Sequence, residues 1–207
     1  MKKALIPLLL SLASALLVSA VAQADEVKPA SPAASQAAAP LPADSVYQLP
    51  LNLTDQQGQR VTLDAWRGQP VLISMFYTSC EFVCPMLVDA MRDTLAKLSP
   101  EEQARMHVWL VSFDPGRDSV EVLKKMADAR QLDAAHWRLA RTDARSVRKL
   151  AAVLGIQFRA LPSGDFNHTS ALILLDAQGC IAAKSTQLGD ADPRFVQQIS
   201  RALASSK

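Results

Sequence analysis

Two cysteines and one distant histidine are the residues of this chain that are best suited to chemistry. Cys80 and Cys84 lie in the segment TSCEFVCP (residues 78–85), and His168 follows much later in the sequence. Two thiols four positions apart can share one metal ion or close one disulfide. If the fold brings the imidazole beside them, the three groups form a soft, three-coordinate site. Such a site suits copper, above all Cu(I), better than the oxygen-preferring ions.

Pro85 predicts where the cysteines lie relative to the following helix. Proline disfavours the helical conformation in the residue before it and is well tolerated at the first helical position. We therefore expect Cys84 at the N-terminus of a helix and Cys80 in the loop that leads into it. The partial positive charge of a helix N-terminus lowers the pKa of a thiol, which would help metal ligation and disulfide exchange equally.

The residues alone leave three interpretations of the pair open. It is a structural disulfide, a redox dithiol that alternates between thiol and disulfide, or part of a metal site. Structural zinc requires four ligands and only three are visible, which shifts the balance towards copper. Of the remaining candidates, Cys180 is interpreted first as a buried small hydrophobic residue, with an exposed, oxidisable thiol as the alternative. His107 and His136 are interpreted as surface or core residues and not as ligands.

Strands and helices alternate along the rest of the sequence. Apolar runs and shorter patterns predict strands at 71–77, 108–113, 136–140, 171–176 and 180–184. Apolar residues at helical spacing, with cap signals such as Asp118 and Gly155, predict helices over 85–98, 118–130, 147–154 and 192–203. A glycine turn at Gly58 predicts an N-terminal β-hairpin from 47–53 and 60–63. The alternation predicts an α/β fold with a mixed central sheet and helices on both faces. A thioredoxin-like domain keeps its chemistry between the first long strand and its helix, where this cysteine pair lies.

The first 24 residues have the pattern of an export signal. Lys2 and Lys3 precede an apolar run, and Ala22-Gln23-Ala24 fits the site that signal peptidase cuts. We expect cleavage after Ala24; the alternative is a membrane anchor, because the run approaches the roughly 20 residues of a spanning helix. Export implies an oxidising compartment, which we expect to be the periplasm.

Composition divides the remainder into a linker and one domain. Residues 25–45 are rich in alanine and proline, which is typical of an extended linker. Residues 46–207 have the length of a single domain. Removing the signal removes two lysines and no acid, so the formal charge of +2 falls to zero. A neutral mature chain gives no support to nucleic-acid binding.

Three sequence features together resemble the Sco/SenC family. They are the segment 77–85, the turn Asp114-Pro115-Gly116-Arg117-Asp118, and the pair His168-Thr169 before a long apolar strand. The resemblance runs from about Tyr47 to the C-terminus. It implies a thioredoxin-like fold that binds one copper ion per monomer, as Cu(I) or Cu(II). Cys80, Cys84 and His168 match the family's metal ligands, and Asp114 matches a supporting acid. Glu81 stands where many members have proline.

The resemblance also implies a function. The family's members are exported or membrane-anchored proteins implicated in delivering copper to cytochrome c oxidase, so the expected partner is a copper-accepting subunit of a respiratory enzyme. A metallochaperone transforms no substrate, and we therefore do not expect an enzyme. The alternative is a thiol–disulfide reductase of a copper site's cysteines, with Cys80 and Cys84 as its redox-active pair. His168 and Thr169 stand where such reductases usually have proline, which favours metal binding. Membrane contact is expected only through the partner or an uncleaved signal.

Overall fold

The computed structural model describes residues 40–80 and 83–206. The predicted signal peptide and most of the predicted linker lie outside these ranges. The described chain is built around a seven-stranded sheet with the order β2-β1-β5-β4-β3-β8-β9. Its strands are β1 (Leu53–Asp55), β2 (Arg60–Val61), β3 (Val71–Phe76), β4 (His107–Ser112), β5 (Trp137–Arg141), β8 (Leu172–Leu175) and β9 (Ile181–Ser185). No helix in the described ranges is both long and apolar enough to cross a lipid bilayer.

The centre of the sheet follows from its apolar runs. β3 is parallel to β4, β4 is parallel to β5, and β3 is antiparallel to β8, so the sheet is mixed. Every residue of β3 and β8 is buried. A strand that is covered on both faces favours apolar side chains on both, which explains why these segments show no polar alternation. The one polar residue, Ser74, donates its hydroxyl hydrogen bond to the Ala171 carbonyl.

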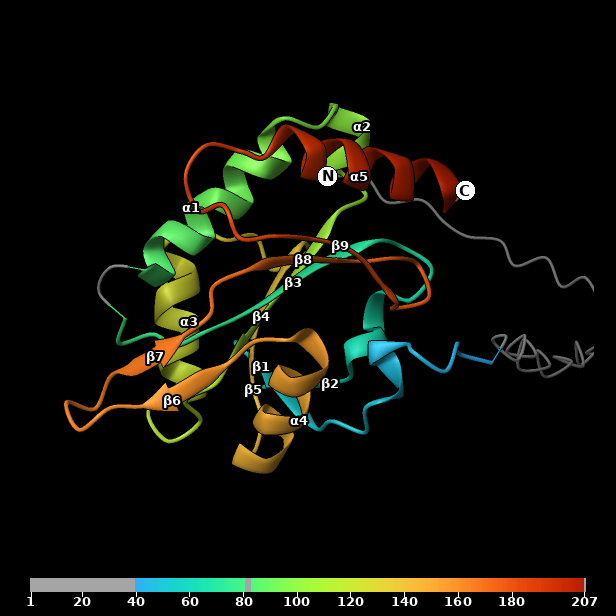
Figure 1. Cartoon of the computed structure of the whole chain (residues 1–207). Helices are drawn as coiled ribbons and strands as arrows, with labels where there is room; N and C mark the ends of the chain where they lie inside the picture. The colour runs from blue at the N-terminus through green and yellow to red at the C-terminus, as the bar shows by residue number, and fades with distance from the viewer. Residues whose placement is uncertain (1–39, 81–82, 207) are drawn as a thin grey trace, which may run out of the picture. The chain divides into compact units, whose positions relative to one another are not determined.

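Helices cover both faces of this sheet (Figure 1). They are α1 (Val83–Ala96), α2 (Pro100–Gln103), α3 (Val120–Ala129), α4 (Ala144–Leu154) and α5 (Pro193–Ser205). Figure 1 shows α1, α2 and α5 on one side of the sheet and α4 on the other. α4 ends where Gly155 takes a left-handed backbone with φ of 65°, a conformation that glycine adopts without steric cost. The predicted thioredoxin-like α/β fold with a mixed sheet is confirmed.

The N-terminal strand prediction is wrong over most of its length. Val46–Gln48 forms a 3-10 helix, η1, and the strand β1 begins only at Leu53. The hydroxyl of Ser45 accepts a hydrogen bond from the Tyr47 N–H and donates one to the carbonyl of Gln178. Residues 46–48 therefore dock against the turn before β9 and do not form the hydrogen bonds to a neighbouring strand that a β-strand would need. β1 and β2 do pair antiparallel across the Gly58 turn, with only three and two residues, and β1 also pairs with β5.

The segment 158–168 forms a hairpin that the sequence patterns did not predict. β6 (Phe158–Ala160) and β7 (Phe166–His168) pair antiparallel as a separate two-stranded sheet. Each strand has three residues, too few for a periodic pattern to identify. The hairpin matters for function because it carries His168.

The predicted start of the second helix is also wrong. Ser119, not Asp118, caps α3, and its side chain accepts a hydrogen bond from the Val122 N–H. The carboxylate of Asp118 instead accepts hydrogen bonds from Thr78 and Ser112. The Asp118 side chain therefore makes tertiary hydrogen bonds and does not cap the helix as the sequence predicted.

Candidate metal centre

The fold brings the three predicted ligands together. The sulfur atoms of Cys80 and Cys84 and a ring nitrogen of His168 all lie within 4.8 Å of one another. In the described ranges, no other group of three histidine, cysteine or acidic side chains comes this close. Residues far apart in the sequence therefore form one group that could hold a metal ion.

Two elements position the cysteines. Cys80 lies in the loop after β3, and Cys84 lies in the first turn of α1. The backbone N–H of Cys84 donates a hydrogen bond to the sulfur of Cys80 over 3.3 Å. Cys84 is only 1% exposed, whereas Cys80 is half-buried. The two thiols are thus close together and differ in their access to solvent.

The pKa of Cys84 contradicts the prediction from the helix N-terminus. Burial raises the pKa of this thiol far above its ordinary value, and the neighbouring Cys80 and Asp118 raise it further. Desolvation disfavours the thiolate more strongly than the first turn of a helix stabilises it. Cys84 is therefore a protonated thiol in the metal-free protein at neutral pH, and a bound metal ion must displace that proton.

The surroundings of His168 favour the neutral form of its ring, which can bind a metal ion. Burial lowers the pKa of this half-buried imidazole, so the ring is neutral at pH 7, which is the form that binds metals. Its Nδ1 lies 3.4 Å from both the Thr169 carbonyl oxygen and the Ser170 hydroxyl. Contact with a carbonyl favours a proton on Nδ1 and leaves the lone pair on Nε2.

An aromatic cluster holds the hairpin and its histidine against the main sheet. The His168 ring packs edge-on against Tyr77, with 5.8 Å between centroids, and lies 5.0 Å from Phe113. Phe166 packs against the same two residues, and Phe158 stacks on Phe113. In the sequence, Phe158 and Phe166 flanking a turn at Gly164 were the one available signal for this hairpin.

A cavity of about 370 Å³ opens beside the centre. It is lined by Tyr77, Ser79, Cys80, Val83, Asp165, Phe166 and His168. Cys84 is not part of its lining. An incoming group can therefore reach Cys80 and His168 from this side, while Cys84 stays covered. Asp114, the predicted supporting acid, is 8% exposed and pairs with Arg117.

Comparisons with known proteins agree with this fold. The family model described as SCO1/SenC matches residues 41–204, and the chain belongs to that family. It is 32% identical over 90 residues to the SCO1 protein homolog of Bacillus subtilis, covering 42% of this chain and 45% of the relative. It is 28% identical over 76 residues to the mitochondrial protein SCO2 of Saccharomyces cerevisiae, covering 37% and 25%. The alignments therefore span less than half of each of these relatives.

Solved structures show the same fold. The copper-bound ScoI of Bradyrhizobium japonicum matches with a TM-score of 0.62 at 24% identity, covering 74% of this chain and 97% of that one. Copper-bound yeast Sco1 matches with a TM-score of 0.62 at 20% identity, covering 75% and 87%.

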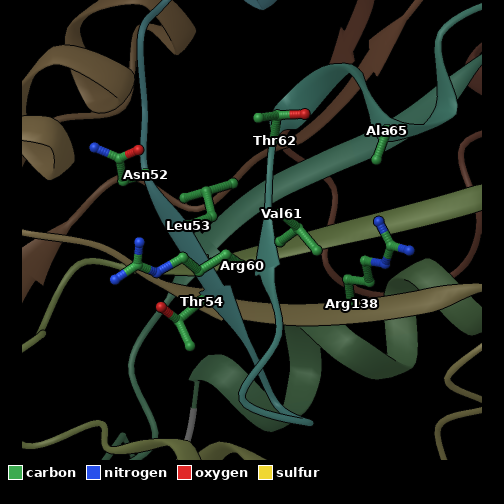
Figure 2. A pocket seen from close by; sticks show the side chains of 8 residues that line it. All are labelled: Asn52, Leu53, Thr54, Arg60, Val61, Thr62, Ala65 and Arg138. Carbon is green, nitrogen blue, oxygen red and sulfur yellow. The ribbon is translucent and has the colours of Figure 1, made fainter.

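A second cavity, of about 620 Å³, lies at the β2 edge of the sheet and is lined by Asn52, Leu53, Thr54, Arg60, Val61, Thr62, Ala65 and Arg138. Figure 2 shows the side chains of Arg60 and Arg138 extending to opposite sides of Val61, so the two guanidinium groups do not converge on one point. Arg138 lies over the Trp66 ring, 4.5 Å from its centroid. This packing assigns Arg138 a structural role.

The two remaining histidines lie outside the group of Cys80, Cys84 and His168. The His107 ring stacks on Trp66 with 4.4 Å between centroids and on His136 with 5.5 Å. Cys180 differs from its prediction, since it is half-buried and its sulfur lies 3.4 Å from an oxygen of Asp44. Burial and the neighbouring acids raise the pKa of Cys180 to about 11.

The His107 stack predicts a loss of stability in acid. Burial, together with the nearby His136 and Arg138, lowers the pKa of His107 to about 4. The unfolded chain takes up a proton here below pH 6.5 and the folded chain does not, so the free energy of unfolding falls as the pH drops from 6.5 towards 4. After allowance for partial exposure, we expect about 1 kcal/mol less stability from this group at pH 5 than at pH 7.5. Urea unfolding at both pH values measures this change. His107→Phe keeps a ring on Trp66 but cannot be protonated, so its stability should differ between the two pH values by about 1 kcal/mol less than that of the unmodified protein.

Proposed function

We propose that this chain is a copper metallochaperone, which binds one copper ion through Cys80, Cys84 and His168 and passes it to a respiratory copper enzyme such as cytochrome c oxidase. The observation that carries the proposal is the approach of two sulfurs and one imidazole nitrogen to within 4.8 Å. Thiolate and imidazole donors together select copper, and Cu(I) in particular, over magnesium or calcium. Two structures of similar fold contain copper, and one relative of similar fold, BsSco, is described as belonging to a family of cytochrome c oxidase assembly proteins.

The geometry suits a site that must release its cargo. Three donors leave copper open to a further ligand, and the cavity beside Cys80 and His168 admits one. A soft ligand from the acceptor would approach from this side and replace Cys80 or His168. Cys84 is the buried donor, so its bond to copper would be the last to break, and its sulfur would take up a proton as the metal leaves.

Location and partner belong to the same proposal. An export signal in residues 1–24, cut after Ala24, would deliver the domain to the periplasm. There it would meet the copper-accepting subunit of the respiratory enzyme. Fractionation of cells that express the full chain, followed by N-terminal sequencing of the mature protein, tests both the compartment and the cleavage site.

Anaerobic titration of the reduced protein with Cu(I), against a chromogenic chelator, tests the ligand assignment. We expect one copper ion per monomer and an affinity that falls at least about tenfold in His168→Ala, because one of three donors is gone. His136→Ala is the matched control, since it removes a histidine outside the centre and should leave the affinity unchanged. Equal affinity for His168→Ala and the unmodified protein would show that the imidazole is not a ligand.

One observation favours the reductase as a second candidate. Cys80 lines an open cavity while Cys84 is buried beside it, an arrangement that suits an attacking and a resolving thiol. The Cys80 thiolate would attack a disulfide of the partner and form a mixed disulfide. Cys84, after losing its proton, would displace the partner and leave a Cys80–Cys84 disulfide and two partner thiols. Insulin reduction by the metal-free protein that survives in His168→Ala would support this candidate.

A further inference from the structure

The turn between β4 and α3 touches both halves of the metal centre. One half is the loop that carries Cys80, and the other is the β6–β7 hairpin that carries His168. The hairpin has no strand pairing with the main sheet in the described ranges. Its position therefore depends on side-chain contacts, and two neighbouring residues of the turn, Arg117 and Asp118, provide contacts to the two halves.

Asp118 holds the cysteine loop. It is fully buried, and its carboxylate accepts hydrogen bonds from the Thr78 N–H at 3.2 Å, from the Thr78 hydroxyl and from the Ser112 hydroxyl. Thr78 lies two residues before Cys80. None of the ion pairs formed by the described residues includes Asp118. A buried carboxylate without a cation is stable only when hydrogen-bond donors surround it, so its position fixes the position of those donors.

Arg117 holds the histidine hairpin. Its guanidinium group lies 5.6 Å from the ring centroid of Phe166 and 5.9 Å from that of Tyr77. Phe166 lies on β7 two residues before His168, and Tyr77 directly follows β3. The Nε of Arg117 donates to the carboxylate of Asp114, which orients the guanidinium between the two rings. A cation beside two aromatic faces attracts both, and here it joins the hairpin to the sheet.

We propose that Arg117 and Asp118 are positioning residues that hold the two halves of the metal centre at ligation distance. Arg117 acts through Phe166 and Tyr77 on His168, and Asp118 acts through Thr78 on Cys80. Neither residue touches the metal. This inference rests on the proposed function, because it takes Cys80, Cys84 and His168 as the copper ligands.

A double-mutant cycle separates the two roles. Arg117→Met keeps the side-chain stem and removes the charge, and we expect it to weaken Cu(I) binding about 3- to 10-fold. Because the effect runs through His168, it should vanish in the His168→Ala background. X-ray absorption of the copper-loaded variant should show a weaker contribution from the imidazole nitrogen. Lys124→Met is the matched control, since it removes the cation of an exposed pair with Asp128 and should change nothing.

Asp118→Asn is expected to behave differently. Outer-shell partners of metal ligands typically contribute 10- to 100-fold to affinity, and we expect a loss of about this size. It acts on the cysteine loop, so the loss should persist in the His168→Ala background. Thr78→Val, which removes one donor to the same carboxylate, provides a milder second variant if Asp118→Asn fails to fold. The melting temperature of each metal-free variant identifies that case.

Two kinds of failure remain distinct. If the unmodified protein takes up no Cu(I), the proposed function is wrong. If it binds Cu(I) and Arg117→Met binds equally well, or loses the same factor with and without His168, the role of Arg117 is wrong. If Asp118→Asn or Thr78→Val folds and keeps full affinity, the role of Asp118 is wrong.

Discussion

Replacing Cys84 with serine is expected to lower the affinity for Cu(I) by at least about 100-fold, because a hydroxyl is a hard, weak donor for a soft ion. Serine fits the space of the buried thiol, which is 1% exposed, so the fold should persist. Competition with a chromogenic chelator under anaerobic conditions measures the change. We expect this loss to exceed that of His168→Ala, because the sulfur of Cys84 is the donor that lies deepest in the site.

Cys180→Ser provides the control for a general effect of losing a thiol. This cysteine is half-buried, lies beside Asp44 and does not belong to the ligand group. Its replacement should leave both the stoichiometry and the affinity unchanged. If Cys180→Ser weakened binding as much as Cys84→Ser, the copper would be bound elsewhere and the assignment of the centre would be wrong.

The core of the fold could be predicted because its residues carry strong local signals. β3 is apolar except for Ser74 and β8 is apolar throughout, and such runs are expected where a strand is covered on both faces. Gly155 marks the end of α4 because only glycine adopts its left-handed backbone easily. In each case the sequence signal and the tertiary environment favour the same structure.

The predictions failed where tertiary contacts outweigh local preference. The sequence predicts a strand over 47–53, yet Ser45 docks Val46–Gln48 as η1 against the turn at Gln178. Asp118 resembles a helix cap in the sequence, yet its carboxylate accepts hydrogen bonds from Thr78 and Ser112. Such contacts join residues far apart in sequence, and no local pattern records them.

Side-chain chemistry together with the family resemblance could predict which three candidate ligands lie together, but not their electrostatics. A proline after Cys84 locates the helix start, and the structure places the thiol in the first turn of α1. The prediction of a lowered pKa failed because it considered the helix and not the burial of the sulfur. The burial of Cys84 and its closeness to Asp118 arise from the tertiary fold, which is information that the local sequence lacks.

The raised pKa of Cys84 predicts that copper affinity depends steeply on pH. The metal-free protein holds a proton on this thiol from pH 6.5 to 8.5, and the copper-bound form does not. For each unit by which the pH rises, protons compete about tenfold less with copper for the sulfur of Cys84. The apparent affinity for copper should therefore rise by at least about tenfold per pH unit. His168 adds little to this slope, because burial lowers its pKa below the ordinary value and so favours the neutral ring across this range.

Titrations at pH 6.5, 7.5 and 8.5, corrected for protonation of the competing chelator, measure the slope. The slope is the change in the logarithm of the affinity per pH unit. In Cys84→Ser this slope should be smaller than in the unmodified protein by about one, because one ionising thiol has been removed. His168→Ala should be weaker at every pH with the same slope as the unmodified protein. An affinity that does not change with pH would mean that Cys84 is already a thiolate or does not bind the metal. The first result would contradict the buried, protonated thiol described above, and the second would contradict its assignment as a ligand.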